Sequence, residues 1–524
     1  MSRRPRQTAP ASESDPLLSL VHVLDWRAAV TPSLVALSDH RGAELTYAGL
    51  AAATNRRAAD FAAAGIGPGD LVPIIARNQV GWVTAMTGLI RLGALPAAVN
   101  WRLASPEVTA LLELMQPAAI LADGLCAAAA KQAAAGLDDP VPVLTMVADA
   151  AGIAGAVKLP PRPIERLRGT EPAVLLHTSG TTGRPKLVPV THQQLIQAAM
   201  FMKLEVPEAL PGARHMSALP LFHLAGLANL SYSLVTGGHL HVLGSFAPTG
   251  FVDELAERRI QLTQLVPTMI QAVTEEVSSR VVTPDLASLT EIVYGASPIR
   301  PDLLKRAVSV LGCRFRQNYA ASETGPLPIS SLAPADHDPA LGLLGTAGRP
   351  SLGWEVRLGE RGEIQVRGAT KLPGYWEDAE ATNDSLTPDG FYRTGDVGTI
   401  DGRGYLTIID RLRDVIISGG ENVFPAEVEA VLAAHAAVAD VAVIGIPDDT
   451  WGETVHAVVV AKTGPYTGDQ FAGELIGFAH ERLAGFKCPT GVTLVPALPR
   501  NATGKVLRAS LREPFWAGRD RRVS

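Results

Sequence analysis

Short apolar segments alternate with alanine-rich segments between residues 17 and 170. The apolar segments include DLVPIIA and AAILAD, and stretches such as AGLAAATNRRAADFAAAG separate them. Strands that alternate with helices form βαβ units around a parallel sheet. A second set of apolar segments follows, with turn residues at their ends: RHMSALPL, GHLHVLG, QLTQLVPT and TEIVYGAS. The sequence therefore predicts two successive α/β subdomains.

The pattern changes near residue 345 and again after residue 410. WEVRLGERGEIQVRG and TGDVGTIDGRGYLTIID are short alternating segments with Gly-Asp or Arg-Gly turns, which is typical of β-hairpins. Beyond Asp410, two helical segments (PAEVEAVLAAH and GELIGFAHERLAG) enclose two strand-like segments (VADVAVIGI and ETVHAVVVA). We expect a small β subdomain, a short junction near Arg411, and a separate α+β domain.

The composition argues against several classes of function. The 524 residues suffice for several compact domains, and 46 basic against 52 acidic residues lack the basic excess of a nucleic-acid-binding protein. No apolar run reaches the length of about 18 residues that a membrane span needs, and none follows the start MSRRPR as in a signal peptide. Three widely spaced cysteines, Cys126, Cys313 and Cys488, indicate no disulfide framework or metal site. We expect a cytoplasmic protein.

The segment AVLLHTSGTTGRPKLVPVTH has the residues of a phosphate-binding loop. Glycines allow a backbone to approach a polyphosphate closely, hydroxyl groups and amides donate hydrogen bonds, and a lysine supplies positive charge. The spacing differs from the GxxxxGK[ST] loop, so a P-loop NTPase fold does not follow. The candidate phosphate-binding residues are Thr178, Ser179, Gly180, Thr181, Thr182, Gly183 and Lys186.

Seven segments in order resemble the motifs of the adenylate-forming superfamily, which contains acyl-CoA synthetases, nonribosomal adenylation domains and luciferases. They are TSGTTGRPK at 178–186, PLFH at 220–223, YGASP at 294–298, YAASE at 319–323, YRTGD at 392–396, DRLRDVIISGGEN at 410–422 and PRNATGK at 499–505. One such segment could arise by chance, but seven in order are specific. The resemblance is to the acyl-CoA synthetase branch.

The resemblance implies the fold class and the domain boundaries. The class is α/β: a large N-terminal domain of two α/β subdomains plus a small β-barrel-like subdomain, with a mobile C-terminal α+β domain. The expected boundaries are a disordered tail at 1–16, the N-terminal domain at 17–410, a hinge at 411–413 and the C-terminal domain at 414–524. Arg413 is the hinge residue.

The resemblance also implies how ATP, and later AMP, is held. The loop from Thr178 to Lys186 would bind the β- and γ-phosphates. Gly295 and Ala296 would cover one face of adenine and Tyr319 the other. Asp396 would accept hydrogen bonds from both ribose hydroxyls, because a carboxylate offers two oxygen atoms.

Four more residues complete the nucleotide site implied by the resemblance. Arg411 and Ser322 would contact the nucleotide, and Glu323 would ligate Mg²⁺, which prefers one or two carboxylates plus phosphate oxygens. Lys505 resembles the lysine that bridges the substrate carboxylate and the α-phosphate during adenylation, a form of electrostatic catalysis.

The segment ISGGENVFPAEVE implies a second half-reaction with coenzyme A. In the ligases that it resembles, the C-terminal domain rotates after the adenylate forms. Gly419 and Gly420 would then line a passage for the pantetheine thiol, where a Cβ would obstruct it. Glu421 would interact with His223 and open that passage. A packed histidine after an apolar segment is the other interpretation of His223.

Three residues depart from the family pattern. Leu187 follows the phosphate-loop lysine where glycine is usual, Ala320 replaces the glycine after Tyr319, and Arg413 stands where aspartate or lysine is usual. An added methyl in a tight site costs about 1–3 kcal/mol, and a displacement of about 1 Å costs on the order of 10²-fold in rate. These departures affect the adenylation step.

The predicted function is therefore an ATP-dependent acyl-CoA synthetase, in which an acyl-adenylate forms and CoA then displaces AMP. One alternative is an impaired adenylator that mainly converts a preformed acyl-adenylate to the thioester. Others are a stand-alone adenylation enzyme that acylates a separate carrier protein, and a non-catalytic nucleotide-binding protein. A luciferase-like oxidative use of the adenylate is disfavoured, because the thiol-passage residues are present.

The segments expected to line the acyl pocket carry few charges, which predicts a hydrophobic or aromatic acid rather than a dicarboxylate. They are residues 222–227, 266–269 and 294–297, with Phe222, Tyr294 and Ala320 as named contacts. The expected partners are the acid or its adenylate and coenzyme A, with a carrier protein as the alternative. A homodimer is left open, and neither nucleic acid nor a membrane is expected.

Overall fold

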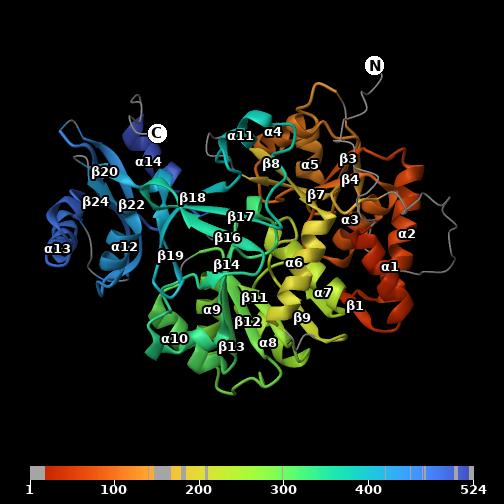
Figure 1. Ribbon diagram of the computed structural model, residues 1–524, viewed down its shortest axis with the longest axis horizontal. Coiled ribbons are helices and arrows are strands. Elements are labelled where there is room, and N and C mark those ends of the chain that lie inside the picture. The colour runs from red at the N-terminus through yellow and green to blue at the C-terminus, as the bar shows by residue number, and fades with distance from the viewer. Residues whose placement is uncertain are drawn as a thin grey trace. The chain divides into compact units, whose positions relative to one another are not determined.

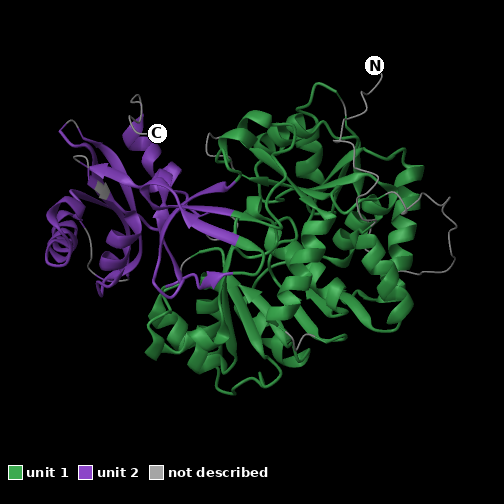
Figure 2. Cartoon of the chain, in the orientation of Figure 1, with its two compact units in different colours: residues 1–345, 351–354, 367–390 green, residues 346–350, 355–366, 391–524 purple. Residues whose placement is uncertain are grey.

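The protein is described by a computed structural model that divides into two compact units (Figure 2). Unit 1 comprises residues 1–345, 351–354 and 367–390, and unit 2 comprises residues 346–350, 355–366 and 391–524. The described residues are 18–139, 141–146, 167–178, 185–206, 210–297, 299–418, 421–448, 450–462, 464, 468–500 and 505–517.

Unit 1 contains a first α/β sheet with strand order β6-β5-β3-β4-β7-β8 (Figure 1). Its strands pair in parallel except for β7 and β8, which form an antiparallel pair at one edge. Their bounds are β3 (Leu71–Ile75), β4 (Leu95–Ala98), β5 (Ile120–Ala122), β6 (Val143–Thr145), β7 (Pro172–Thr178) and β8 (Lys186–Thr191).

The second sheet of unit 1 has a parallel core in the order β13-β12-β11-β9-β10-β1, and β14 and β2 pair antiparallel with the two outer strands of that core. Ligands of open α/β sheets bind at the carboxyl ends of parallel strands. The bounds are β1 (Val35–Asp39), β2 (Glu44–Thr46), β9 (Arg214–Ser217), β10 (His239–Val242), β11 (Leu262–Leu265), β12 (Glu291–Gly295), β13 (Arg314–Tyr319) and β14 (Ser330–Leu332).

The helices of unit 1 begin and end at sequence signals that are visible in the chain. Thr191 caps α6 in a capping box with Gln194, and proline stands in the first turn of α8, α9 and α10. The bounds are α1 (Leu20–Val30), α2 (Tyr47–Ala63), α3 (Val80–Leu92), α4 (Ser105–Met115), α5 (Ala127–Ala134), α6 (His192–Glu205), α7 (Leu224–Thr236), α8 (Pro248–Glu257), α9 (Pro267–Ser279), α10 (Pro301–Leu311) and α11 (Ala379–Asp384).

Different helices cover the two faces of the second sheet. Side chains alternate between the faces of a strand. On one face, Ile292 and Tyr294 of β12 enter a hydrophobic cluster that also contains residues of α8, α9 and α10. On the other face, the Asn229 amide of α7 donates to Ser217 Oγ of β9 at 3.2 Å. Helix α7 packs beside α6 (Figure 1).

Unit 2 contains a small antiparallel-rich sheet, β16-β17-β18-β19, and a C-terminal sheet, β21-β20-β23-β22, to which β24 adds along β23. The strand bounds are β15 (Arg349–Pro350), β16 (Trp354–Leu358), β17 (Glu363–Gly368), β18 (Tyr392–Ile400), β19 (Leu406–Arg411), β20 (Ile416–Ser418), β21 (Glu421–Val423), β22 (Val438–Asp448), β23 (Gly452–Ala461) and β24 (Gly491–Leu494). The helices are α12 (Pro425–Ala433), α13 (Gly468–His480) and α14 (Arg508–Trp516).

The predicted α/β fold class, with a large N-terminal domain and a C-terminal α+β domain, is confirmed. Unit 2 contains β18 and β19 together with the C-terminal segment. The hinge at 411–413 stays a prediction, and the expected tail at 1–16 lies outside the described residues. Across the described ranges, no helix is both long and apolar enough to cross a membrane.

A buried ion pair stabilises the second sheet and provides a stability test. Arg316 of β13 donates through Nε to Glu291 of β12 at 2.8 Å, and both side chains are at most 4% exposed. Removing one partner of a buried pair costs about 3–5 kcal/mol. We expect Arg316→Met to lower the unfolding midpoint in urea correspondingly. The control Arg300→Met removes an exposed pair with Asp302 and should cost less than about 1 kcal/mol; equal midpoints for both variants would contradict this prediction.

Candidate active site

The predicted phosphate loop connects two paired strands at the edge of the first sheet. Strand β7 ends at Thr178 and β8 begins at Lys186, and these two residues are partners in the antiparallel register. The structure therefore places both ends of the loop together. The five predicted phosphate-binding residues between them, Ser179, Gly180, Thr181, Thr182 and Gly183, lie outside the described residues.

A tyrosine joins the phosphate-loop lysine to the predicted metal ligand. The Lys186 ammonium lies 4.7 Å from the centroid of the Tyr375 ring, and the Tyr375 hydroxyl donates to Glu323 Oε1 at 3.1 Å. Glu323 belongs to a single turn of 3₁₀ helix, Ser322–Thr324, that follows β13. A cation over an aromatic face and a hydrogen bond to a carboxylate are both attractive. Unit 1 thus brings Lys186 and Glu323 to one place.

This arrangement is compatible with Mg²⁺ bound mainly by phosphate oxygens. Within the described ranges no group of three or more His, Cys, Asp or Glu residues could hold a metal ion. Mg²⁺ commonly takes only one or two protein carboxylates and retains water and phosphate ligands. The single carboxylate of Glu323 fits that mode of binding.

Leu187 is part of the hydrophobic core of the first sheet. Its side chain is 1% exposed and belongs to the cluster that contains Leu175, against which Trp376 also packs. The backbone carbonyl of Leu187 accepts a hydrogen bond from Trp376 N at 2.9 Å. Because side chains alternate along β8, Leu187 points away from the face that carries Lys186. The first departure from the family pattern therefore fills a core position.

The predicted adenine site lies where β12 and β13 come unusually close. A Cβ on Gly295 would stand 2.3 Å from the carbonyl oxygen of Asn318, its partner in the parallel register. The next residue, Ala296, has a φ of +70°, which is rare for a residue with a Cβ. Tyr319 ends β13 and is buried, whereas Ala320 is exposed. Strain of this kind clusters at functional sites.

Tyr294 faces the opposite side of the sheet from Gly295. Its side chain is 1% exposed in the hydrophobic cluster, and its hydroxyl lies 3.1 Å from His337 Nε2. Its assignment to the acyl pocket stays a prediction.

His223 lies at the N-terminus of α7 in a cluster of neutral imidazoles. Its ring packs against Phe222, with centroids 4.7 Å apart, and its Nε2 is buried with no hydrogen-bond partner in the described part of the chain. Burial lowers the pKa of His223 to about 4, and His177 and Arg102 lower it further. His177 Nε2 accepts from Asn100 N at 3.2 Å, and burial also lowers its pKa to about 4. Both histidines are uncharged at neutral pH.

Unit 2 brings its predicted nucleotide residues together. Asp396 of β18 and Arg411 of β19 are partners in the antiparallel register, with Arg411 Nε 3.2 Å from Asp396 Oδ1. Lys505 lies within electrostatic range of both. Burial, followed by the guanidinium of Arg411, lowers the pKa of Lys505 to about 8, and the carboxylate of Asp396 opposes the shift. Arg413 is exposed.

The thiol-passage residues are partly described. Glu421 begins β21 and is exposed, but it belongs to unit 2 and His223 to unit 1. The predicted interaction between them stays a prediction. Gly419 and Gly420 lie outside the described residues.

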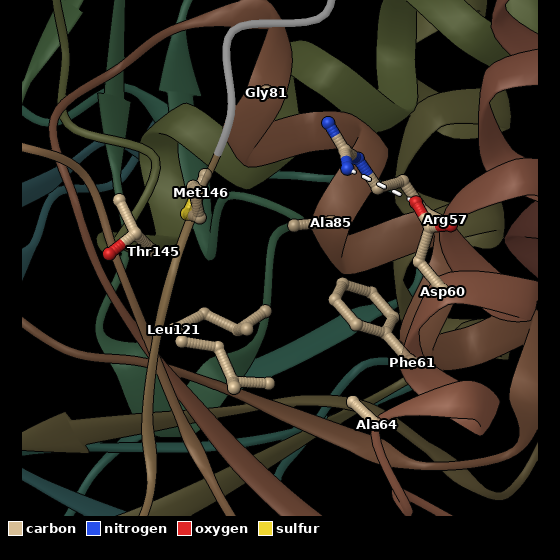
Figure 3. A pocket seen from close by; sticks show the side chains of 10 residues that line it. Arg57, Asp60, Phe61, Ala64, Gly81, Ala85, Leu121, Thr145 and Met146 are labelled. Carbon is tan, nitrogen blue, oxygen red and sulfur yellow. Dashed lines mark hydrogen bonds and ion pairs between the residues drawn. The ribbon is translucent and has the colours of Figure 1, made fainter.

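A cavity of about 140 Å³ also occurs in unit 1, bordered by α2, α3, β5 and β6. Figure 3 shows the Arg57–Asp60 pair on one side of it and Leu121 and Met146 across from them. None of the predicted site residues lines this cavity.

Two family models match the chain over most of its length. The AMP-binding enzyme model matches residues 24–376, and the model of the AMP-binding enzyme C-terminal domain matches residues 427–505. The chain belongs to the AMP-binding enzyme family. The predicted membership of the adenylate-forming superfamily, in its acyl-CoA synthetase branch, is thereby confirmed, as is an ATP-dependent ligase.

Two relatives and one solved enzyme show which AMP-binding enzymes the chain is similar to. Fatty acid–[acyl-carrier-protein] ligase ScoC of Streptomyces coeruleorubidus is 34% identical over 97% of this chain and 98% of its own length. Feruloyl-CoA synthase of Amycolatopsis sp. is 35% identical over 93% of this chain and 97% of its own length. o-Succinylbenzoate CoA synthetase of Bacillus subtilis has been solved with its acyl-adenylate intermediate. That structure matches with a TM-score of 0.80 and 30% identity, over 93% of this chain and 97% of its own. The same enzyme has been solved with ATP and magnesium ion.

The sequence predictions missed three polar residues of the site. Tyr375 follows the turn residues Pro373-Gly374, and Asn100 and His177 end apolar runs. A polar residue at the end of an apolar run is the signal that could have identified the last two. Tyr375 is brought to Lys186 and Glu323 from a distant part of unit 1, which no local pattern indicates.

Tyr375 provides a test of the phosphate and metal site. Tyr375→Phe keeps the ring beside Lys186 but removes the hydrogen bond to Glu323, and a bond to a charged group contributes about 1.5–3 kcal/mol. We expect at least a 10-fold fall in kcat/KM for Mg-ATP, measured by pyrophosphate release, and a larger fall for Tyr375→Leu. Tyr405→Phe in unit 2 is the matched control and should leave this value unchanged. Wild-type kcat/KM in Tyr375→Phe would contradict the assignment.

Lys505 provides a pH test of the adenylation step. Because its pKa is lowered to about 8, the ammonium is lost as the pH rises through that value, so adenylation kcat/KM should decline above pH 8. Lys505→Arg retains its charge there, so the alkaline decline should disappear although the rate is lower.

The second half-reaction serves as the control for this test. Thioester formation from a synthetic acyl-adenylate and CoA should lack the alkaline decline and should survive Lys505→Ala, which should abolish adenylation. Loss of both half-reactions in Lys505→Ala would argue against the assigned role.

Proposed function

We propose that this acyl-CoA synthetase activates a hydrophobic or aromatic carboxylic acid with ATP and transfers the acyl group to coenzyme A. A carboxylate oxygen attacks the α-phosphorus of ATP, and pyrophosphate leaves. The CoA sulfur then attacks the acyl carbon, AMP leaves, and the thiol proton is released. The observation that carries the proposal is the uncharged lining of the predicted acyl segments, in which His223 is neutral at physiological pH.

The residues of unit 1 would act on the polyphosphate and the metal. Lys186 would place positive charge on the phosphates, and Glu323 would hold Mg²⁺, which supplies charge neutralisation when bound. Tyr375 orients both side chains through its ring and its hydroxyl. Gly295 and Ala296 would present a flat backbone surface to adenine, since a Cβ at Gly295 has no space.

The residues of unit 2 would act on the ribose and the reacting carboxylate. Asp396 would accept the ribose hydroxyls while Arg411 holds its carboxylate in place. Lys505 would stabilise the charge that builds up as the carboxylate approaches the α-phosphate. The predicted rotation of the C-terminal domain would then bring Glu421 toward the thiol path.

Both half-reactions belong to the proposal, although Ala320 is expected to slow the first. Leu187 is accommodated in the core, so it does not alter the face of β8 that carries Lys186. Ala320 is exposed after β13, so its methyl group would meet the substrate rather than protein atoms. Of the two departures in unit 1, Ala320 is therefore the one that supports the impaired adenylator.

Comparison of the two half-reactions tests the proposal. A panel of aryl and alkyl acids is supplied with Mg-ATP and CoA, and the synthetic adenylate of each active acid is supplied with CoA alone. We expect acyl-CoA to form in both assays. Ala320→Gly should raise the ATP-dependent rate about 10-fold, because relieving a misplacement of the reacting groups by well under 1 Å has an effect of that order. Thioester from the adenylate alone would favour the impaired adenylator, and no thioester from either would overturn the proposal.

A carrier protein is the second candidate acceptor. It is supported by the similarity to ScoC, whose name gives an acyl-carrier-protein ligase. The same assay with a phosphopantetheinylated carrier protein in place of CoA distinguishes the two acceptors by the ratio of their kcat/KM values.

A further inference from the structure

A second, small cavity of about 20 Å³ lies beneath α7 in unit 1. A cavity of that size holds about one water molecule or one polar group of a ligand. It is formed by α7 and the three adjacent strands β9, β11 and β12. Its lining residues are His215, Met216, Asn229, Tyr232, Leu262, Thr263, Gln264 and Val293.

This cavity continues the predicted acyl pocket along the same elements. The pocket segment 222–227 leads into Asn229 on α7, the segment 266–269 follows Gln264 on β11, and the segment 294–297 follows Val293 on β12. Val293 and Gly295 are two residues apart on one strand and therefore share a face. Gln264 is the register partner of Val293 and lies on that face as well. The cavity is thus at the inner end of the acyl pocket.

The register gives the depth of the cavity. His215 is level with Leu262, and Leu262 is level with Glu291, which is four residues before Gly295. At about 3.3 Å per residue in parallel strands, His215 starts about 13 Å below the level of Gly295. The imidazole spans part of that distance. An arylpropenoic acid, with its carboxylate at the carboxyl end of the strands, would reach it with the far side of its ring.

His215 is held rigidly with one ring nitrogen unused. Its Nδ1 lies 2.8 Å from Ser233 Oγ, and its ring stacks on Tyr232 with centroids 5.5 Å apart. The ring also fills the space beside Gly238, where a Cβ would stand 2.9 Å from it. The residue is 4% exposed, and its Nε2 is buried with no partner among the described residues. A buried polar atom without a partner costs free energy that a ligand can recover.

The inner end of the pocket is polar but uncharged. Its polar residues are an imidazole, two amides, a threonine and a tyrosine whose hydroxyl donates to the Val206 carbonyl, with no lysine, arginine, aspartate or glutamate in the lining. Burial lowers the pKa of His215 to about 4, so the ring is neutral at physiological pH. A second carboxylate would find no cation here, and a hydrocarbon end would leave Nε2 unpaired. A hydroxyl group suits either tautomer, because it can both donate and accept.

We propose that the acid carries a hydroxyl group at its far end and that His215 is the residue that selects it, through Nε2. Gln264 and Asn229 place further amide groups around the same point. This inference rests on the proposed function, and it narrows the acid from hydrophobic or aromatic to hydroxylated, with an aryl acid such as 4-hydroxycinnamate as the model substrate.

Equilibrium binding to the full-length protein tests the inference without requiring turnover. Dissociation constants for 4-hydroxycinnamate and cinnamate are measured by calorimetry in the presence of AMP. We expect 4-hydroxycinnamate to bind about 10- to 100-fold more tightly than cinnamate. That factor corresponds to leaving one buried hydrogen-bonding group without a partner. His215→Leu should reduce this ratio to about one while cinnamate still binds.

A neighbouring histidine provides the matched control. His239 on β10 bonds to Ser38 Oγ and does not line the cavity, so His239→Leu should retain the hydroxyl preference. Gln264→Met is the second pocket variant, and it should also reduce the ratio of the two dissociation constants. It keeps the inference testable if His215→Leu fails to fold.

The outcomes for the inference and for the proposed function are separate. Equal dissociation constants for the two acids, or a preference that persists in both pocket variants, overturn the inference. Thioester formation is measured on the same protein. If the hydroxyl preference depends on His215 but no acyl-CoA forms from any acid, the inference stands and the proposed function fails.

Discussion

The close approach of β12 and β13 is the constraint on which the site of unit 1 depends. Gly295 allows the two backbones to pair where a Cβ would stand 2.3 Å from the Asn318 carbonyl oxygen. The register that results fixes Tyr319 at the end of β13 and the strained Ala296 at the end of β12. Through β11 and β9 the same register sets the depth of the cavity at His215. The predicted adenine site and the cavity at His215 are therefore positioned by one ladder of parallel strands.

Burial away from water sets the charges of several candidate site residues. Burial keeps His177, His215 and His223 neutral at physiological pH, because an imidazolium without hydration or a partner is unstable. The same effect, together with Arg411, brings the Lys505 pKa close to physiological pH. The histidines on the predicted acyl side are thus uncharged, whereas Lys505 on the predicted nucleotide side keeps its positive charge at neutral pH.

The sequence predicted the fold class and the grouping of several site residues, but not the polar contacts that orient them. Alternating strands and helices sufficed for the two α/β sheets, and the ordered motifs include Lys186 and Glu323, which the structure brings to the same tyrosine. The sequence did not predict the position of Tyr375, because its contacts are with residues far away in the chain. Leu187 departs from the family pattern in a way that the sequence alone connects with the adenylation step, yet its alternation along β8 places it in the core.

The sequence by itself determined the kind of chemistry, since a glycine- and hydroxyl-rich loop, a carboxylate and a lysine are chemical requirements that residue types reveal. The tertiary structure decided which neighbour each group has. His215 shows the difference: in the chain it is one histidine among twelve. In the fold it lines a cavity, and the packing of Tyr232, Ser233 and Gly238 around it leaves Nε2 buried without a partner among the described residues. Specificity depends on such placement, because a hydrogen bond needs its partners within about 3 Å of each other.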